Sequence, residues 1–343
     1  MELSPRKEAV LAAVVRAYLQ TGEPVGSKTL AALLQDAPSA ATLRNEMNAL
    51  CALGFLCQPH TSAGRVPTGN GYRFYVNQLM KPNPLAQSTG DFIDSRFVGA
   101  DAEPEQLLAR AGRILSDLTG LPAFSFYEAE ETVTVRRVQT VPIGSHGIMT
   151  VTVLSDGRTR SRLCRIPDGF SHEHAERFSE LLRTRVCRHT VGELNKAYLQ
   201  NVIASAGLDF FTLMPLLTQV FEMVDEMSAS SVRWQNPAAL YGVCGEDGAR
   251  RLMTLSGSTE SFSALFPTSA KGTDILLGTD AVYPELQNAC LIVSDCRTEQ
   301  KYCGKIGVVG SCRMPYEQII PSIEYTAARL SERLTEAKKN MED

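Results

Sequence analysis

The sequence predicts an α+β multidomain protein, and three observations lead to this fold class. The chain has 343 residues, more than one hydrophobic core usually supports, so two or three domains are expected. The first 80 residues read as capped helices followed by a short strand and a basic loop, the order of a winged helix-turn-helix. The remaining residues mix strand patterns with long amphipathic helices, which predicts a larger body behind this N-terminal head.

Three helices are predicted at the start of the head. Ser4 is a favourable N-cap, and Pro5 follows in the first helical position, where its missing N–H costs nothing. Gly22 is expected to end this helix, while Ser27 and Ser39 are expected to cap the second and third helices. The second helix carries three leucines that are expected to face inward: Leu30, Leu33 and Leu34.

The third predicted helix has one apolar side and one hydrogen-bonding side. At about 100° per residue, Leu43, Met47 and Leu50 fall together and are expected to be buried. Asparagine reads adenine edges, arginine reads guanine edges or contacts phosphates, and small methyl groups contact thymine methyls. The sequence therefore predicts a recognition helix for a DNA major groove, although an ordinary exposed face of a packing helix is the alternative. The residues expected to contact DNA from this helix are Ser39, Ala41, Thr42, Arg44, Asn45 and Asn48, with the two asparagines discriminating between bases.

A short strand at 55–58 and a loop at 59–65 are expected to form the wing. The loop sequence PHTSAGR offers an imidazole, two hydroxyl groups, a glycine and a permanently charged guanidinium. Such a tip can lie along phosphates or reach into a minor groove, and the alternative is an ordinary hairpin turn. Thr68 is expected to cap a last helix, whose apolar stripe returns the chain to the core of the head. The residues expected to contact DNA from this side are Lys28, His60, Thr61, Ser62 and Arg65.

Charge is divided unevenly along the chain. Residues 1–80 hold seven Lys or Arg against five Asp or Glu, whereas the remainder holds 27 against 33. A mildly basic head on an acidic body suits a protein that touches a polyanion at one end only. Double-stranded DNA is therefore the expected partner of the head.

No motif in the sequence predicts catalysis, a cofactor or a metal site. The chain has no GxxxxGK[ST], no GxGxxG after a strand and no HExxH. Its nine cysteines contain no CxxC pair and its five histidines lack ligand spacing, so the cysteines are interpreted as small buried hydrophobes. No stretch approaches the roughly 20 apolar residues that span a bilayer, and the N-terminus lacks the apolar core of a signal peptide. The sequence thus predicts a cytoplasmic protein that is not an enzyme and has no membrane partner.

The body is expected to be a strand-rich domain interrupted by helices. Strands are predicted at 133–141, 147–154, 159–166, 240–244, 274–277, 289–294 and 305–309, and helices at 103–119, 172–187, 191–206, 210–227 and 316–338. The predicted boundaries are 1–80 for the head, 81–102 for a linker, 103–168 and 238–343 for the strand-rich domain, and 169–237 for the helical insertion. The surplus apolar surface of the inserted helices is expected to form a dimer contact, and the strand edges are the alternative.

Four arginines crowd the third predicted strand of the body: Arg158, Arg160, Arg162 and Arg165. The first three share one face, because side chains alternate along a strand. An acidic body surrounds them, so a solvated or subunit-facing edge is the favoured interpretation over a second DNA surface.

The chain resembles the HrcA family of heat-inducible transcription repressors in four segments of the head. These segments are GEPVGSK at 22–28, LRNEM at 43–47, QPHTSAGRVPT at 58–68 and GYRFYV at 71–76. The resemblance implies a homodimer that represses chaperone operons until heat shock by binding an inverted-repeat operator called CIRCE. It also implies that the bacterial chaperonin keeps the repressor active, that the strand-rich domain is GAF-like and that the insertion is a mainly helical dimerisation domain.

The resemblance extends to the body with two departures. The segment GSCRMPY at 310–316 follows a family pattern Gly-Pro-Thr-Arg-Met-x-Tyr, with Ser311-Cys312 in place of Pro-Thr. The segment GTDA at 278–281 stands where the family has Gly-x-Glu-Asn. The leading hypothesis is a dimeric winged-helix repressor. The alternatives are a one-component regulator with an effector bound in the GAF-like domain, and a chaperone-binding scaffold with only non-specific DNA affinity.

Overall fold

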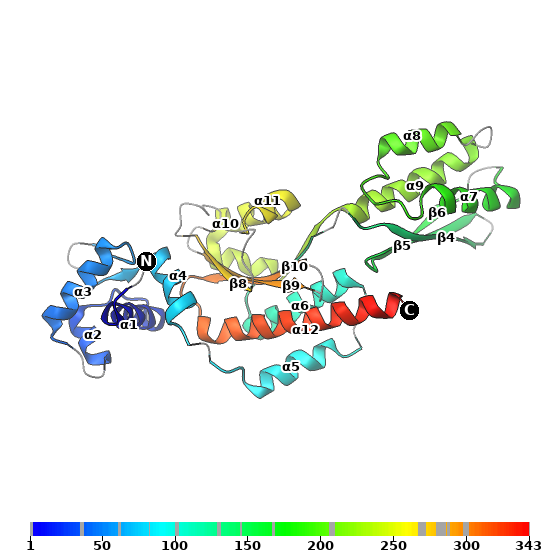
Figure 1. Cartoon of the computed structure of the whole chain (residues 1–343). Coiled ribbons are helices and arrows are strands. Elements are labelled where there is room, and N and C mark those ends of the chain that lie inside the picture. Colours follow the sequence, from blue (N-terminus) through cyan, green and yellow to red (C-terminus); the bar gives the residue numbers. More distant parts are fainter. Residues whose placement is uncertain are drawn as a thin grey trace.

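Three units follow one another in an elongated row, as Figure 1 shows, with the head at one end, a central domain in the middle and an inserted unit at the other end. The computed structural model describes residues 3–34, 38–60, 63–81, 83–99, 103–128, 132–144, 146–166, 169–205, 210–266, 272–278, 286, 289–297 and 302–342. Among the helices within these ranges, none has both the length and the apolar character needed to cross a membrane.

The head has the predicted order of a winged helix-turn-helix. Its elements are α1 (Pro5–Thr21), α2 (Ser27–Leu33), α3 (Ala40–Ala52), β1 (Leu56–Cys57), β2 (Val66–Pro67), α4 (Gly69–Phe74) and the π-helix η1 (Tyr75–Leu79). The two wing strands pair antiparallel between α3 and α4. The side chains of Ser4, Ser39 and Thr68 each accept a hydrogen bond from a backbone N–H of the first turn, which confirms these three N-caps.

Helix α2 differs from its prediction at both ends. Its N-cap is Gly26 rather than Ser27, and no side chain caps it. Leu30 is fully buried, whereas Leu33 is 55% exposed. The predicted inward position of Leu33 is wrong, because the helix ends at this residue and the extended backbone at Leu34 leaves no further turn to cover it.

The central domain is a five-stranded antiparallel sheet between two layers of helices (Figure 1). The strand order is β7 (Ser231–Gln235), β3 (Ala123–Tyr127), β10 (Tyr302–Ser311), β9 (Ala289–Arg297) and β8 (Thr273–Leu277). One face packs on α6 (Pro104–Thr119) and α12 (Tyr316–Glu342), and this hydrophobic core continues into the head. The other face packs Phe124 and Phe126 against α10 (Leu240–Ser256) and α11 (Thr259–Ser263), with the 3₁₀ turn η3 (Pro237–Ala239) leading into α10.

Three predictions about the central domain are wrong. Residues 240–244 belong to a helix rather than a strand. The buried residues Leu240, Cys244 and Leu252 are four or eight positions apart, which places them on one side of a helix. Strands β3 and β7 were not predicted, because all of β3 is buried and therefore shows no alternation. The predicted linker contains α5 (Gln87–Phe97), whose buried Ile93 and Phe97 join the core formed with α12.

The inserted unit begins earlier than predicted and ends earlier. Strands β4 (Val135–Ile143), β5 (Gly147–Leu154) and β6 (Thr159–Arg165) form a separate three-stranded antiparallel sheet that packs on α7 (His172–Arg185), α8 (Lys196–Ser205) and α9 (Phe210–Ser228). Strand β7, in contrast, pairs with β3 of the central sheet. The predicted boundaries 169 and 237 are therefore wrong, because the three strands share a core with the helices and β7 does not.

The apolar face of α9 is buried in the core of the inserted unit. Its residues Leu217, Val220 and Val224 are buried against the three-stranded sheet and the neighbouring helices, so these side chains are not open to a second copy. Uncovered apolar surface remains at Met214 of α9, which is 41% exposed, and on the opposite face of the sheet. There Val141 and Leu163, 48% and 64% exposed, lie on either side of Met149 in the strand register.

The arginine row of β6 serves the inserted unit itself. Arg158 is only 3% exposed and pairs with Asp156 at 2.7 Å, above the ring of Tyr127 at 4.6 Å. It also donates to the carbonyl of Met227 and lies 3.9 Å from a carboxylate oxygen of Glu105 in the central domain. Arg160 and Arg162 pair with carboxylates of α9, namely Glu226 for both and Glu222 for Arg162. The expected solvated or subunit-facing edge is wrong for the buried Arg158, whereas Arg160 and Arg162 lie on an edge strand and keep 38% and 31% of their side chains exposed.

Most described cysteines are small buried side chains, as the sequence predicted. Cys164, Cys244, Cys290, Cys296 and Cys312 are buried, whereas Cys51 and Cys187 are half-buried. Cys57, on wing strand β1, is exposed. Within the described ranges no three His, Cys, Asp or Glu side chains lie together as a metal site.

Candidate DNA-binding surface

Helix α3 is oriented as its sequence predicted. Leu43, Met47 and Leu50 are at most 3% exposed and form part of the core of the head. The opposite side presents Ala41, Arg44, Asn45 and Asn48 to solvent. We call these four residues the reading face.

The N-terminus of α3 is capped by the hydroxyl group of Ser39, which also contacts that of Thr42. The Oγ of Ser39 accepts a hydrogen bond from the backbone N–H of Thr42 at 3.2 Å, and the two hydroxyls lie 2.9 Å apart. Both predicted DNA contacts are therefore engaged in the helix cap. The remaining N–H groups of the first turn and the positive end of the helix dipole favour a phosphate at this position.

The reading face carries no carboxylate. The one acid of α3, Glu46, pairs with Lys7 of α1 at 3.1 Å, which turns its charge towards α1. Among the residues that the structure describes, Arg44 and Asn45 have no hydrogen-bond or ion-pair partner. Their side chains are thus available for base edges or phosphates.

The wing is fixed at its base to the loop between α1 and α2. Val25 and Arg65 exchange two backbone hydrogen bonds of 2.9 Å each. Gly64 approaches this loop so closely that a Cβ there would lie 2.4 Å from the carbonyl oxygen of Val25, so only glycine fits. Beyond this base, the side chain of Gln58 donates to the carbonyl of Ala63 at 3.1 Å and closes the turn.

The structure places the predicted wing residues at different positions. His60 is exposed at the start of the turn, while Thr61 and Ser62 lie outside the described residues. Arg65 does not project from the tip. Its Nη2 donates to Oδ1 of Asn48 at 2.7 Å, so the guanidinium lies at the base of the wing, on α3. This bond holds the wing and the recognition helix in one relative position. The spacing of side chains within α3 could not reveal that Arg65 pairs with Asn48.

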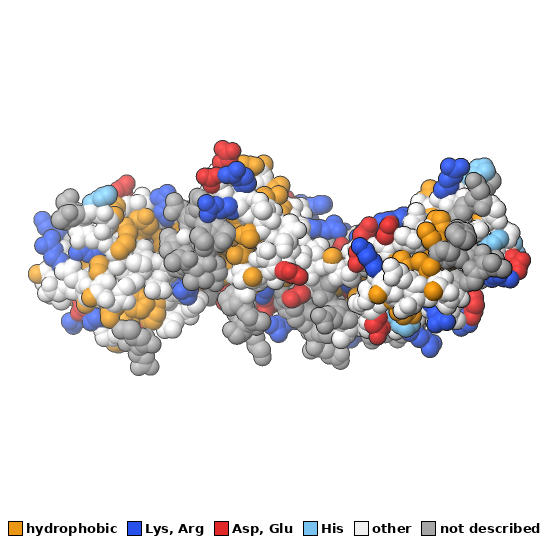
Figure 2. Space-filling model, turned by 90° about the horizontal axis from the view of Figure 1, so that it is seen from above, with side chains coloured by type: hydrophobic (Ala, Val, Ile, Leu, Met, Phe, Trp, Pro, Cys, Tyr) orange, Lys and Arg blue, Asp and Glu red, His pale blue; other side chains and the backbone are white. Residues whose placement is uncertain are grey.

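Two of the positive charges of the head lie on α2 and α3 without a partner among the described residues. Lys28 at the start of α2 and Arg44 on α3 are exposed and without a partner within the described part of the chain. Lys7 and Arg16 are instead paired with Glu46 and Glu317. Figure 2 shows Lys and Arg side chains distributed over the head. Unpaired cations beside an acid-free face suit a phosphate backbone flanking a groove.

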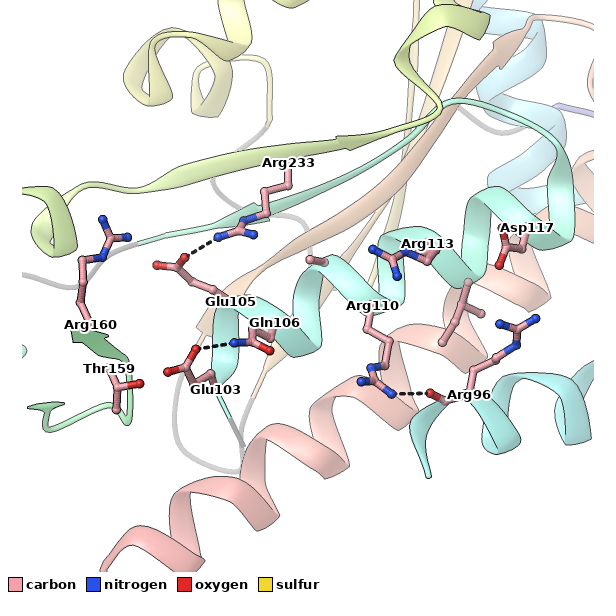
Figure 3. Close-up of a pocket in the computed structure, with 12 residues that line it drawn as sticks. Arg96, Glu103, Glu105, Gln106, Arg110, Arg113, Asp117, Thr159, Arg160 and Arg233 are labelled. Carbon is pink, nitrogen blue, oxygen red and sulfur yellow. Dashed lines mark hydrogen bonds and ion pairs between the residues drawn. The ribbon is translucent and has the colours of Figure 1, made fainter. Parts of the chain in front are cut away.

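A second candidate site is a polar cavity of about 540 Å³ between α6 and the inserted unit (Figure 3). Its arginines are largely engaged: Arg233 pairs with Glu105 at 3.0 Å, and Arg110 donates to the carbonyl of Arg96 at 3.1 Å. Among the described residues that line it, there is no cysteine, histidine or serine. We therefore interpret the cavity as a gap at the boundary between the central domain and the inserted unit, and not as a catalytic site.

The fold and the reading face together define a winged-helix DNA-binding protein. Two family models match the chain: "Winged helix-turn-helix transcription repressor, HrcA DNA-binding" over residues 2–81 and "HrcA protein C terminal domain" over residues 105–320. The chain belongs to the HrcA family of heat-inducible transcription repressors.

Individual relatives agree over nearly the whole chain. The heat-inducible transcription repressor HrcA of Syntrophobacter fumaroxidans is 30% identical, with 98% of each chain covered. That of Moorella thermoacetica is 29% identical, covering 97% of this chain and 98% of the relative. A solved structure described as a hypothetical protein superposes with a TM-score of 0.69 at 22% identity, covering 98% of this chain and all of that one, and shows the same fold.

Membership of this family decides between the hypotheses drawn from the sequence. The protein is a transcription repressor with a winged-helix DNA-binding domain and not an enzyme. A one-component ligand sensor is not favoured.

Proposed function

We propose that the protein acts in the bacterial cytoplasm as a homodimer on a CIRCE-like inverted repeat upstream of chaperone operons, and represses them until heat shock. The reading face of α3, exposed, free of carboxylates and flanked by Lys28, is the observation that carries the proposal. A two-fold protein presents two identical reading faces, so its operator must contain two half-sites related by the same symmetry.

The open face of the three-stranded sheet supports the homodimer. Val141, Met149 and Leu163 form one cross-strand row on this face, and exposed apolar groups of this kind are stabilised when a second copy covers them. Leu163→Asp is expected to raise the dimer dissociation constant at least tenfold, measured by sedimentation. Thr159→Asp, at the far end of the same strand face, is the matched control and should leave the dimer intact. An unchanged dimer in Leu163→Asp would move the interface elsewhere.

Footprinting on the organism's chaperone promoters tests the operator. Protection of two symmetric half-sites is expected for the wild-type protein, and protection of scrambled sequence to the same extent would refute sequence-specific repression. Adding purified chaperonin to the same reaction tests the proposed activation: it should increase the protected fraction at a fixed repressor concentration, and no increase would remove the chaperonin from the mechanism.

Asn45→Ala is expected to weaken operator binding by about 1–3 kcal/mol and to relax the preference for one base pair in each half-site. The reason is that Asn45 is exposed at the centre of the reading face without an internal partner among the described residues. Competition binding with single-base operator variants measures both effects. Asn70→Ala, an exposed asparagine of α4, is the control, and equal losses in the two variants would contradict base reading by α3.

A further inference from the structure

The first turn of α12 and the segment before it touch the head through two conspicuous contacts. The ring of Tyr316 lies against the ring of Tyr72 in α4, with centroids 6.2 Å apart, and both side chains are buried. The guanidinium of Arg313 lies over Gly22, the left-handed residue that ends α1, at a position where a Cβ would collide with Nη1. The body thus holds the head at α1 and α4, and α1 in turn packs on the recognition helix α3.

A third contact is polar and joins side chains far apart in sequence. The hydroxyl of Tyr75 donates to Oε1 of Glu317 at 2.8 Å and accepts from Nε of Arg16 at 3.4 Å. Arg16 lies 3.9 Å from the same carboxylate oxygen. Burial raises the pKa of Tyr75, and the Glu317 carboxylate raises it further against the opposing effect of Arg16. The hydroxyl therefore stays protonated and donates. We call Arg16, Tyr75 and Glu317 the head–body joint.

The joint sits where the chain leaves the head. Tyr75 is the first residue of the π-helix η1, and short π-helical turns occur preferentially at functional positions. A few residues later the backbone N–H of Asn83 donates to the carbonyl of Glu317 at 3.2 Å. Glu317 also lines a cavity of about 630 Å³ together with residues 83–86 of this segment. The turn of α12 is therefore not packed on all sides, and the polar joint adds a directional contact to the hydrophobic core that the head shares with the central domain.

We propose that the head–body joint sets the half-site spacing that the repressor accepts. This inference rests on the proposed dimer and inverted-repeat operator. Each base pair added between two half-sites moves them apart by about 3.4 Å and rotates one relative to the other by roughly 35°. Heads held rigidly on their bodies match both half-sites at one spacing only, whereas heads on a loosened joint adapt to several. Arg16, Tyr75 and Glu317 are accordingly positioning residues that need not touch DNA.

Two single-atom deletions in the full-length protein provide the test. Tyr75→Phe removes the joint hydroxyl and keeps a fully buried ring. Tyr72→Phe is the matched control, since its buried hydroxyl has no hydrogen-bond partner among the described residues. Glu317→Ala removes the carboxylate that the body contributes to the joint. Binding is measured by fluorescence anisotropy on duplexes selected with the wild-type protein, with half-sites moved apart or together in steps of one base pair, and on a duplex carrying one half-site.

The expected wild-type result is at least a tenfold preference for one spacing over spacings two base pairs away. Tyr75→Phe and Glu317→Ala should reduce this preference below threefold and leave the single half-site affinity unchanged, while Tyr72→Phe behaves as wild type. Retention of the tenfold preference in both joint variants overturns the proposal. A loss of single half-site affinity places the role of Tyr75 inside the head and also overturns it. If the wild-type protein shows no preference for inverted repeats at any spacing, the proposed function itself fails.

Discussion

Arg158→Ala is expected to destabilise the junction between the central domain and the inserted unit by about 3–5 kcal/mol. Arg158 is almost completely buried, and its guanidinium pairs with Asp156 and approaches Glu105. Removing it leaves the largely buried carboxylate of Asp156 without its cation, whereas Glu105 keeps Arg233 as its partner. Breaking one side of a buried ion pair is costly for this reason. The carbonyl of Met227, at the end of α9, also loses its donor.

Urea unfolding followed by the fluorescence of Trp234 measures this effect. Trp234 is the single tryptophan of the chain and lies on β7, the strand that re-enters the central sheet from α9. The midpoint of its transition should fall clearly in Arg158→Ala. Arg165→Ala removes an exposed arginine at the last position of β6, the strand that follows Arg158, and should leave the midpoint unchanged. Coincident curves for the two variants would show that the buried pair contributes nothing to the junction.

Arg65→Ala is expected to cost about 3 kcal/mol of operator affinity and to relax base preference, without changing the salt dependence of binding. The physical reason is the position of the guanidinium: it donates to Asn48 at the base of the wing instead of reaching out from the tip. Its loss releases Asn48 from a charge-assisted hydrogen bond and separates the wing from the reading face.

Comparison with Lys28→Ala distinguishes this structural role of Arg65 from a phosphate contact. Lys28 is exposed and unpaired within the described part of the chain, so its loss should weaken operator and scrambled duplexes alike and reduce the slope of log K against log salt by about 1. Titrations of both variants between low and moderate salt compare the slopes. If Arg65→Ala flattened the slope as Lys28→Ala does, Arg65 would be a phosphate contact, as its sequence position suggests.

The head could be predicted from sequence because its signals are local. Caps at Ser4, Ser39 and Thr68 and the heptad-like spacing of Leu43, Met47 and Leu50 each depend on residues within one or two turns. The body was harder, because long-range pairing decides its elements. Strand β3 is recognisable only from its neighbours β7 and β10, which lie more than 100 residues away in sequence, and buried strands lose the alternation that marks half-exposed ones.

The same difference between local and long-range signals applies to the candidate DNA-binding surface. The exposed side of α3 followed from helix geometry, and the structure describes it as such. The partner of Asn48 did not follow, since the bond from Arg65 forms only when the wing folds back on the helix. The membership of three strands in the inserted unit was likewise hidden, because their apolar positions fit either sheet until the helices that cover them are placed.

The thiols of this chain offer a direct means of observing the wing. Burial raises the pKa of Cys51, Cys164 and Cys244, and a thiol that stays protonated reacts slowly with maleimides. Among the eight cysteines whose side chains the structure describes, only Cys57 is exposed, and it lies on wing strand β1. A dye attached there under brief, mildly alkaline labelling would report the approach of a duplex without introducing a new residue.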